Sequence, residues 1–319
     1  MQKIDVIIPT YKPDKVFETL IEKLEHQTVP VHQIILMNTE QKYFDQMLYG
    51  TNLIRRYQNI TVHHISQREF DHGRTRHEGI LKSEADIVIL MTQDALPADD
   101  TLVERLIEPL QSPWVPVSYA RQLPAQDCNE IEQFTRAFNY PDKSGVKSLE
   151  DLPELGIKTF FCSNVCAAYK RDLYLELGGF TRHTIFNEDM IFASGVIRKG
   201  YKIAYAADAR VVHSHNYTCR QQFHRNFDLG VSQADHPEVF ADVPSESEGV
   251  KMVKKTALHL CHIGKPWLII ELVWKTAGKY MGYRLGKSYK KLTRKKILKY
   301  TMNKAYWDSV YAENQELKS

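Results

Sequence analysis

Residues 87–100 have the sequence IVILMTQDALPADD, in which an apolar run ends abruptly at Thr92, Gln93 and Asp94. The apolar run has the length of a buried strand, and Pro97 with the acids that follow predicts a turn and a capped helix. A carboxylate placed directly after a buried strand allows two interpretations. It is either a metal ligand at the tip of the strand or part of a polar loop. From this stretch alone the polar loop is favoured.

Similar apolar runs recur through the first 110 residues and alternate with helical patterns, such as the helix predicted after a cap at Asp14. This alternation predicts the α/β class, with a mostly parallel, Rossmann-like sheet covered by helices on both faces. Such sheets bind ligands beyond the carboxyl ends of their strands. Polar residues stand at three such ends, and the metal-ligand interpretation of Asp94 becomes as strong as the loop. The predicted strands lie at 4–9, 33–38, 59–66 and 86–92.

The middle of the chain, about 111–160, is less regular and predicts long functional loops. Beyond it, Glu188 and Asp189 open a predicted helix, and a later predicted strand carries His213 and His215, which would share one face. Carboxylates together with imidazoles suit Mn²⁺ or Mg²⁺ better than a structural zinc ion. Other interpretations stay open, because Asp189 could simply cap the helix and either histidine could be an ordinary buried residue.

Charge is unevenly distributed along the chain. Residues 251–319 hold 16 Lys and Arg against 4 Asp and Glu, whereas residues 1–250 hold 26 against 35. A basic tail on an acidic body predicts an anionic partner, either a nucleic acid or a membrane surface. No zinc-ligand spacing or RNA-stacking motif is apparent in the sequence, which disfavours a nucleic-acid-binding protein.

The tail itself predicts a basic amphipathic helical region after a polar linker at 242–249. Aromatic and apolar residues between 267 and 283 alternate with lysines, which suits a helix lying in a membrane interface. The alternative is a helix packed on the rest of the chain or on a second subunit. The apolar stretch at 266–274 is too short to span a bilayer, and the N-terminus lacks a signal-peptide pattern. We therefore expect a cytoplasmic protein, peripheral at the inner face of the plasma membrane.

Taken in order, several motifs over about residues 1–240 resemble those of family 2 glycosyltransferases with the GT-A fold. They are VIIPTYKP, HQTVPVHQIILMN, GRTRHEGI, VILMTQDALPADD, SNVCAAYKRDLYLELGGF, NEDMIFASGVIRKGYKIAY and VVHSHNYTCRQQFHRNF. The segments TQDALPAD, RQLP, FNYP and HSHNY are further similar to a bacterial subgroup described as rhamnosyltransferases.

This resemblance implies a GT-A catalytic domain at 1–245, with a nucleotide-sugar half at about 1–110 and an acceptor half at about 111–245. A basic helical extension, 246–319, would follow. The implied activity is inverting, metal-dependent transfer of a sugar, foremost L-rhamnose from dTDP-rhamnose, to a hydroxyl of a lipid-linked or polysaccharide acceptor in bacterial cell-surface glycan synthesis. A UDP-sugar donor, an inactive nucleotide-sugar-binding scaffold and a metal-dependent hydrolase are the alternatives.

The resemblance also implies catalytic and metal-binding roles. The family's Asp-x-Asp motif falls on Thr92-Gln93-Asp94, so that only Asp94 keeps a carboxylate. Asp94 would hold Mn²⁺ or Mg²⁺, with His213 or His215 as a further ligand. Asp189 matches the catalytic base, beside Glu188.

Donor and acceptor contacts are implied in the same way. Tyr11 would stack on the donor's base, Asn38 would accept a hydrogen bond from it, and Arg225 would grip the diphosphate. Arg225 belongs to a Gln-x-x-Arg-Trp-like motif whose tryptophan is Asn226 here, which argues against a processive polymerase. The implied donor-binding residues are Pro9, Thr10, Tyr11, Asn38, Arg76, Gln93 and Arg225, and the implied acceptor-binding residues are Ser163 and Asn164.

Overall fold

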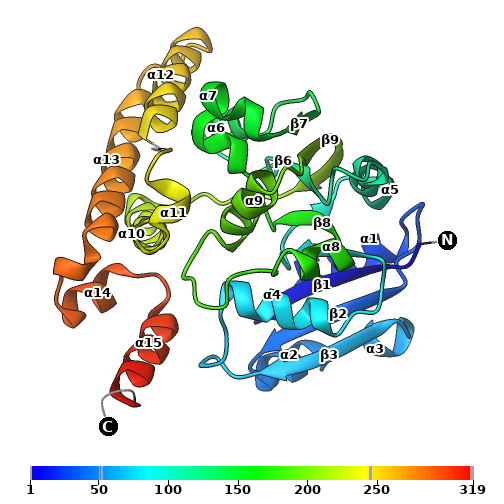
Figure 1. Cartoon of the computed structure of the whole chain (residues 1–319). Coiled ribbons are helices and arrows are strands. Elements are labelled where there is room, and N and C mark those ends of the chain that lie inside the picture. Colours follow the sequence, from blue (N-terminus) through cyan, green and yellow to red (C-terminus); the bar gives the residue numbers. More distant parts are fainter. Residues whose placement is uncertain (1, 50, 52, 244–245, 317–319) are drawn as a thin grey trace. The chain divides into compact units, whose positions relative to one another are not determined.

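The computed structural model of the chain describes residues 2–49, 51, 53–243 and 246–316 (Figure 1). The chain forms two compact units, each built from three segments. The first unit comprises Met1–Ala125, Tyr140–His183 and Glu188–His213, and the second comprises Gln126–Asn139, Thr184–Asn187 and Ser214–Ser319. These units cut the chain at other places than the predicted boundary at 245/246, and that functional division stays a prediction.

A nine-stranded sheet forms the centre of the first unit, with strand order β3-β2-β1-β4-β8-β6-β9-β5 and β7 paired to β9. Strands β3, β2, β1 and β4 are parallel, while β8 is antiparallel to both β4 and β6. The predicted α/β architecture with a mostly parallel sheet is confirmed. The strands are β1 (Ile4–Tyr11), β2 (Gln33–Thr39), β3 (Ile60–Ile65), β4 (Ile87–Met91), β5 (Leu96–Pro97), β6 (Val117–Leu123), β7 (Gly145–Lys147), β8 (Cys166–Lys170) and β9 (Ile203–Val212).

Helices flank this sheet, and the cap residues explain where they begin. Asp14 accepts hydrogen bonds from the amides of Val16 and Phe17 and so starts α1, as predicted. Asp71 caps α4 through the amide of Arg74. The helices of the first unit are α1 (Lys15–Glu25), α2 (Gln41–Leu48), α3 (Leu53–Arg56), α4 (His72–Leu81), α5 (Leu102–Ile107), α7 (Leu152–Leu155), α8 (Arg171–Glu176) and α9 (Glu188–Arg198), with short 3₁₀ turns η1 (Glu108–Gln111), η2 (Leu149–Asp151) and η3 (Gly156–Phe160).

One prediction about the strands is wrong. The segment after α9 forms a single strand, β9, that ends at Val212, so neither His213 nor His215 lies on a strand. The amide of His213 still donates to the carbonyl of Leu123 at the end of β6, whereas the side chain of Asn216 bonds to the loop before α6. The two histidines are therefore placed by a loop and not by strand alternation.

The second unit is helical, as predicted for the C-terminal region. Its helices are α6 (Glu130–Asn139), α10 (Cys219–Asp235), α11 (Pro237–Phe240), α12 (Glu246–His262), α13 (Leu268–Lys287), α14 (Arg294–Tyr300) and α15 (Lys304–Glu316), with a 3₁₀ turn η4 (Tyr289–Lys291). Helix α12 begins at Glu246, so the end of the predicted linker is helical, whereas 244–245 lie outside the described residues. Among the helices described, none is both long enough and apolar enough to cross a membrane.

Helices α10 and α13 approach each other very closely. Gly278, Gly282 and Gly286 stand at every fourth position of α13 and face the backbone of α10. A Cβ atom added at Gly282 would lie 2.2 Å from the carbonyl oxygen of Phe223, and one at Gly286 would lie 2.1 Å from that of Phe227. We call this contact the glycine seam. It holds two helices at a distance that no larger residue permits.

Candidate active site

Asp94 lies where β4 of the first unit runs out into a turn. The amide of Thr92 still donates to the carbonyl of Val165 on the β8 side, and the amide of Ala95 then donates back to Thr92. The turn leaves the Asp94 side chain partly exposed, and its Oδ1 lies 3.5 Å from Nε2 of the largely buried His213. The strand therefore ends on a carboxylate that faces an imidazole from a distant part of the chain.

Gln122 at the end of β6 orients this imidazole. Nδ1 of His213 lies 3.0 Å from Oε1 of Gln122, and only a protonated Nδ1 can donate to that oxygen. The amide of Gln122 is itself held, because its Nε2 donates to the hydroxyls of Tyr140 (2.6 Å) and Ser163 (3.0 Å). In neutral His213 the lone pair consequently sits on Nε2, the atom nearest Asp94. A partner that fixes the tautomer in this way is typical of metal-ligating histidines.

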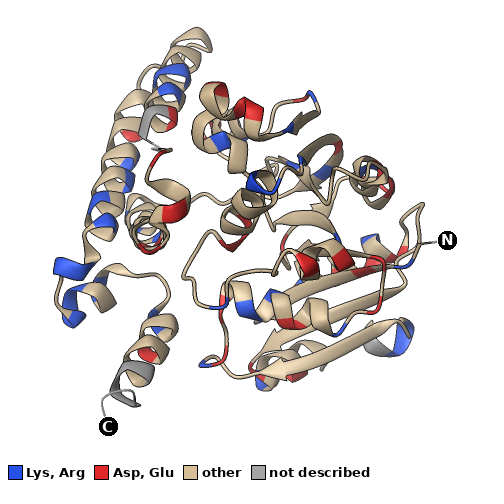
Figure 2. Ribbon diagram, in the orientation of Figure 1, with Lys and Arg blue, Asp and Glu red and all other residues tan. Residues whose placement is uncertain are grey.

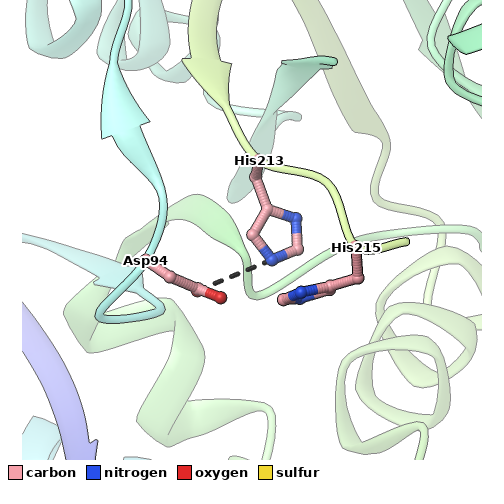
Figure 3. A group of neighbouring side chains, drawn as sticks. All are labelled: Asp94, His213 and His215. Atoms are coloured by element: carbon pink, nitrogen blue, oxygen red, sulfur yellow. Dashed lines mark ion pairs between the residues drawn. The ribbon is translucent and has the colours of Figure 1, made fainter. Parts of the chain in front are cut away.

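His215 follows His213 along the chain with one residue between them. One ligand atom from each of Asp94, His213 and His215 lies within 4.8 Å of the other two, and Figure 3 shows Asp94 and His213 pointing toward one another. One carboxylate and two imidazoles are ligand types that could hold a divalent metal ion. The three predicted metal ligands are thus brought together, although their predicted strand does not exist.

Asp189 occupies the first turn of α9 and carries an unusual carboxyl group. Its Oδ2 accepts a hydrogen bond from the Asn164 amide (3.1 Å) and its Oδ1 from the Met190 amide (2.8 Å). Desolvation and the neighbouring charge of Glu188 outweigh these bonds and raise the pKa of Asp189 to about 7. A carboxylate with a pKa near neutrality is suited to take up a proton during a reaction.

Glu188 has a different environment. Its carboxylate forms a buried ion pair with Arg76 (3.2 Å) and accepts a hydrogen bond from Nδ2 of Asn164 (3.1 Å). Although desolvation works in the opposite direction, Arg76 and His72 lower the pKa of Glu188, so this group stays ionised. Glu188 therefore serves as a fixed negative charge next to Asp189, while Arg76 and Asn164 hold it in place.

This network also contains the residues predicted to contact substrates. Ser163 and Asn164 are buried, and their polar side-chain atoms bond to Gln122, Glu188 and Tyr169. Asn164 thus holds both carboxylates, through its amide to Asp189 and its side chain to Glu188, whereas Ser163 holds Gln122. Direct contact of Arg76, Ser163 or Asn164 with a substrate stays a prediction.

The carboxyl ends of β1 and β2 carry a further set of polar residues. Asn38 is fully buried, where its Oδ1 accepts from the Thr10 hydroxyl (3.1 Å) and its Nδ2 lies 3.0 Å from Nδ1 of His64. The Gln93 amide bonds to both the N–H and the carbonyl of Tyr11. Pro9 precedes Thr10 within β1 and is partly buried. Asn38 and Thr10 thus form a buried, hydrogen-bonded pair at these strand ends.

Two aromatic side chains near the end of β1 are at least partly exposed. Tyr11 meets Tyr43 edge-to-face at 5.5 Å between ring centroids, and Nζ of Lys12 lies 5.2 Å and 4.7 Å from the two rings. Two aromatic rings with an ammonium group can stack on a planar base and attract an anionic group beside it.

Arg225 belongs to the second unit, on α10. Its guanidinium lies over the ring of Phe186 at 4.5 Å and over that of Tyr217 at 5.9 Å. A stacked guanidinium keeps its edge N–H groups available for an anion.

The model of the family described as glycosyl transferase family 2 matches residues 5–178 of the chain, which is more than half of its 319 residues. The chain belongs to this family. Family 2 membership makes the chain a glycosyltransferase.

Two relatives are similar in sequence to this chain along nearly its whole length. The O-antigen chain rhamnosyltransferase RfbN of Salmonella typhimurium is 37% identical over 99% of this chain and 100% of its own length. The O-antigen chain rhamnosyltransferase WbaN of Salmonella anatum is 36% identical over 100% of both chains.

Solved structures share the fold at lower identity. The mannosyltransferase PcManGT from Pyrobaculum calidifontis, solved with GDP-Man and Mn²⁺, has a TM-score of 0.56 at 14% identity and covers 100% of this chain and 88% of its own. Residues 1–349 of S. aureus TarS have a TM-score of 0.51 at 15% identity, covering 90% of this chain and 91% of that one. At these identities the likeness establishes the GT-A fold alone.

Sequence reasoning missed two features of this family 2 site. Gln122 was not singled out, although it belongs to the RQLP segment that marks the end of β6. Lys12 and Tyr43 were also missed. Lys12 directly follows Tyr11 and adopts a positive φ of 51°, which is uncommon outside glycine and asparagine.

Proposed function

We propose that the chain transfers L-rhamnose from dTDP-rhamnose, with inversion, to a hydroxyl of a lipid-linked or polysaccharide acceptor in bacterial cell-surface glycan synthesis. The relatives named as O-antigen chain rhamnosyltransferases support this choice, because they match the whole chain. The observation that carries the chemistry is Asp189, a carboxyl group with a pKa of about 7 within a fixed hydrogen-bond network.

In this proposal Asp189 takes the proton from the acceptor hydroxyl while that oxygen attacks the anomeric carbon. Glu188 acts as a positioning residue, since its charge keeps the pKa of Asp189 high. Its hydrogen bond with the Asn164 side chain also holds the Asn164 backbone amide, which donates to Asp189. Tyr11, Tyr43 and Lys12 flank the nucleotide, with Gln93 holding the Tyr11 backbone.

Asp94 and His213, joined by His215, would hold a divalent ion, and Mn²⁺ suits this ligand set better than Mg²⁺ because two of three ligands are nitrogen. When bound, the ion offsets negative charge on the leaving nucleoside diphosphate. Gln122 contributes by keeping His213 in the tautomer that presents Nε2.

A panel of nucleotide-sugars tests the proposal directly. We expect nucleoside diphosphate release from dTDP-rhamnose in the presence of Mn²⁺, and none in EDTA. Release from a UDP-sugar instead would keep the reaction class and reject the rhamnose donor. Metal-dependent binding without release, even with a lipid-linked acceptor supplied, would favour an inactive binding protein.

Asp94→Ala tests the metal site. Removing a charged ligand should weaken Mn²⁺ binding more than the 10- to 100-fold loss typical of changes to supporting residues. The measurement is Mn²⁺ titration by calorimetry or electron paramagnetic resonance. Asp100→Ala is the matched control, because Asp100 is an exposed carboxylate in the same loop. Equal Mn²⁺ affinity in the two variants would remove Asp94 from the metal site.

The pKa of Asp189 predicts a pH dependence. The base must be ionised, and because its pKa is raised to about 7, the rate should rise with pH and level off above about pH 7. We expect the acid limb of kcat/KM against pH to lie near 7 rather than near 4, the ordinary range of an aspartate. A rate that is flat from pH 5 to 8 would contradict a raised pKa for the base.

The membrane part of the proposal rests on helix α13. Figure 2 shows Lys and Arg recurring along α12, α13 and α14. One face of α13 carries five large apolar side chains at helical spacing, each more than half exposed, and we call this face the apolar stripe. Basic helices with an exposed apolar face suit an anionic lipid surface. The stripe consists of Ile270, Val273, Trp274, Tyr280 and Met281.

The double variant Ile270→Glu/Trp274→Glu should lose binding to phosphatidylglycerol-containing vesicles by at least about tenfold, because two apolar contacts are replaced by charges that anionic lipid repels. Co-sedimentation measures this. Trp114→Glu is the control, since Trp114 is similarly exposed but lies in the first unit. Unchanged vesicle binding would exclude the stripe as the contact, and conversion of a dimer to a monomer would assign it to a second subunit.

A further inference from the structure

A small pocket lies within the second unit, among α6, α10, α12 and α13. Its volume is about 20 Å³, more than the roughly 10–15 Å³ that one water requires. It therefore suits a small group such as one phosphoryl rather than a whole nucleotide. The polar side chains that line it are Asn129, Glu132, Thr135, His215, Tyr217, Gln222, Lys275, Thr276 and Lys279.

Lys279 is the unusual member of this pocket. Within the described part of the chain its ammonium forms neither an ion pair nor a hydrogen bond with another side chain. The neighbouring Lys275, by contrast, is paired with Glu271 at 2.7 Å. An ammonium group that is largely withdrawn from water without a counter-charge is unfavourable, and such groups are usually paired. Lys279 therefore lacks the partner that its position calls for.

Further cations lie close to Lys279. Burial is the main reason that the pKa of Lys279 is lowered; the Glu132 carboxylate opposes this effect, and the charges of Lys275, Arg225 and Arg136 reinforce it. Glu132 cannot serve Lys279 fully, because it is already in an ion pair with Arg136 at 2.8 Å. The pocket thus holds more positive than negative charge, and hydroxyl and amide groups stand around it.

We propose that this pocket binds a phosphoryl group of a substrate, with Lys279 as its principal counter-charge and the hydroxyl of Thr276 and the amides of Asn129 and Gln222 as hydrogen-bond donors. A phosphoryl group supplies the negative charge and the several acceptor oxygens that these donors require. The source is either a nucleoside diphosphate or a lipid diphosphate. Only this choice of source rests on the proposed function; phosphoryl binding itself does not.

Inorganic pyrophosphate in EDTA is the probe, because without a divalent ion its binding reports the cations of the chain and requires no sugar transfer. By calorimetry we expect Lys279→Met to lower the affinity for pyrophosphate at least tenfold. Lys287→Met should change this affinity less than twofold, since Lys287 is an exposed lysine on the same helix. The thermal midpoint of ligand-free Lys279→Met should equal or exceed that of wild type, because an unpaired charge is removed.

Thr276→Val gives a second, milder test in case Lys279→Met fails to fold. We expect this variant to lose several-fold in affinity for pyrophosphate. Repeating the titration with dTDP and with farnesyl diphosphate assigns the source, according to which ligand loses affinity in the variants. Failure of pyrophosphate to bind wild type in EDTA would overturn the proposal, as would equal affinity in wild type, Lys279→Met and Thr276→Val. If the protein binds pyrophosphate in this way but transfers no rhamnose, the proposed donor is wrong while the proposed phosphoryl-binding pocket stands.

Discussion

Asp189→Asn is expected to lower kcat by on the order of 1,000-fold, within the range that general acid–base groups contribute. The substitution keeps the size of the side chain but removes the group that takes up the proton. One oxygen remains to accept a hydrogen bond from either the Asn164 or the Met190 amide, so the start of α9 should persist. Rhamnosyl transfer followed by nucleoside diphosphate release measures the rate, and the Kd for the donor should change little.

Glu188→Gln provides the contrast that separates a base from a positioning residue. Its charge is one cause of the raised pKa of Asp189, so losing it should move the acid limb of the pH profile below pH 7 while activity persists. The partner Arg76 loses its counter-charge, which should lower the pKa of Asp189 further. If Asp189→Asn retained more than about a tenth of wild-type kcat, the base would have to be sought elsewhere.

The sequence predicted the parallel half of the sheet and the place of Asp94 at a strand end, for a physical reason. Strands buried on both faces are continuous apolar runs, so β1, β2 and β4 could be found without knowing their partners. Polar residues that directly follow such runs must lie at the rim of the sheet. Asp94 was found in this way.

Contacts between distant residues could not be predicted in the same way. Gln122 and His213 are 91 residues apart, and their bond exists because β6 and β9 are neighbours in the sheet. The pairing of Arg76 with Glu188 likewise depends on the fold, and no local pattern distinguishes a substrate-binding arginine from one that holds a carboxylate. The end of β9 was also misjudged, because His213 and His215 keep a strand-like spacing in a loop.

The glycine seam could be predicted from the sequence only in part. Gly278, Gly282 and Gly286 recur at every fourth residue, and that spacing alone marks one narrow face of a helix. The partner could not be found from spacing, since Phe223 and Phe227 contribute backbone atoms rather than a recognisable side-chain pattern. The seam decides how the basic helix α13 is attached to α10, and with it where Lys279 and the apolar stripe are presented.

Gly282→Ala is therefore expected to destabilise the second unit, although the same change in most helices is stabilising. Alanine is favoured over glycine by about 1 kcal/mol in a helix interior. Here the added methyl group would lie 2.2 Å from the carbonyl oxygen of Phe223, so the two helices must separate along the seam. Overpacking of this kind costs about 1–3 kcal/mol, so after the gain in helix propensity we expect a net loss of about 1 kcal/mol, and at most about 2 kcal/mol, in the free energy of unfolding.

Urea titration followed by tryptophan fluorescence can measure this loss in the second unit specifically. Trp267, Trp274 and Trp307 lie in that unit, so a Trp114→Phe background removes the single tryptophan of the first. Gly249→Ala in α12 is the matched control, because nothing lies within 4 Å of its added methyl group, and it should stabilise the unit by up to about 1 kcal/mol. Stabilisation by both substitutions would mean that α10 and α13 do not touch through the seam; opposite signs would establish a backbone contact as the reason that α13 carries glycine at every fourth position.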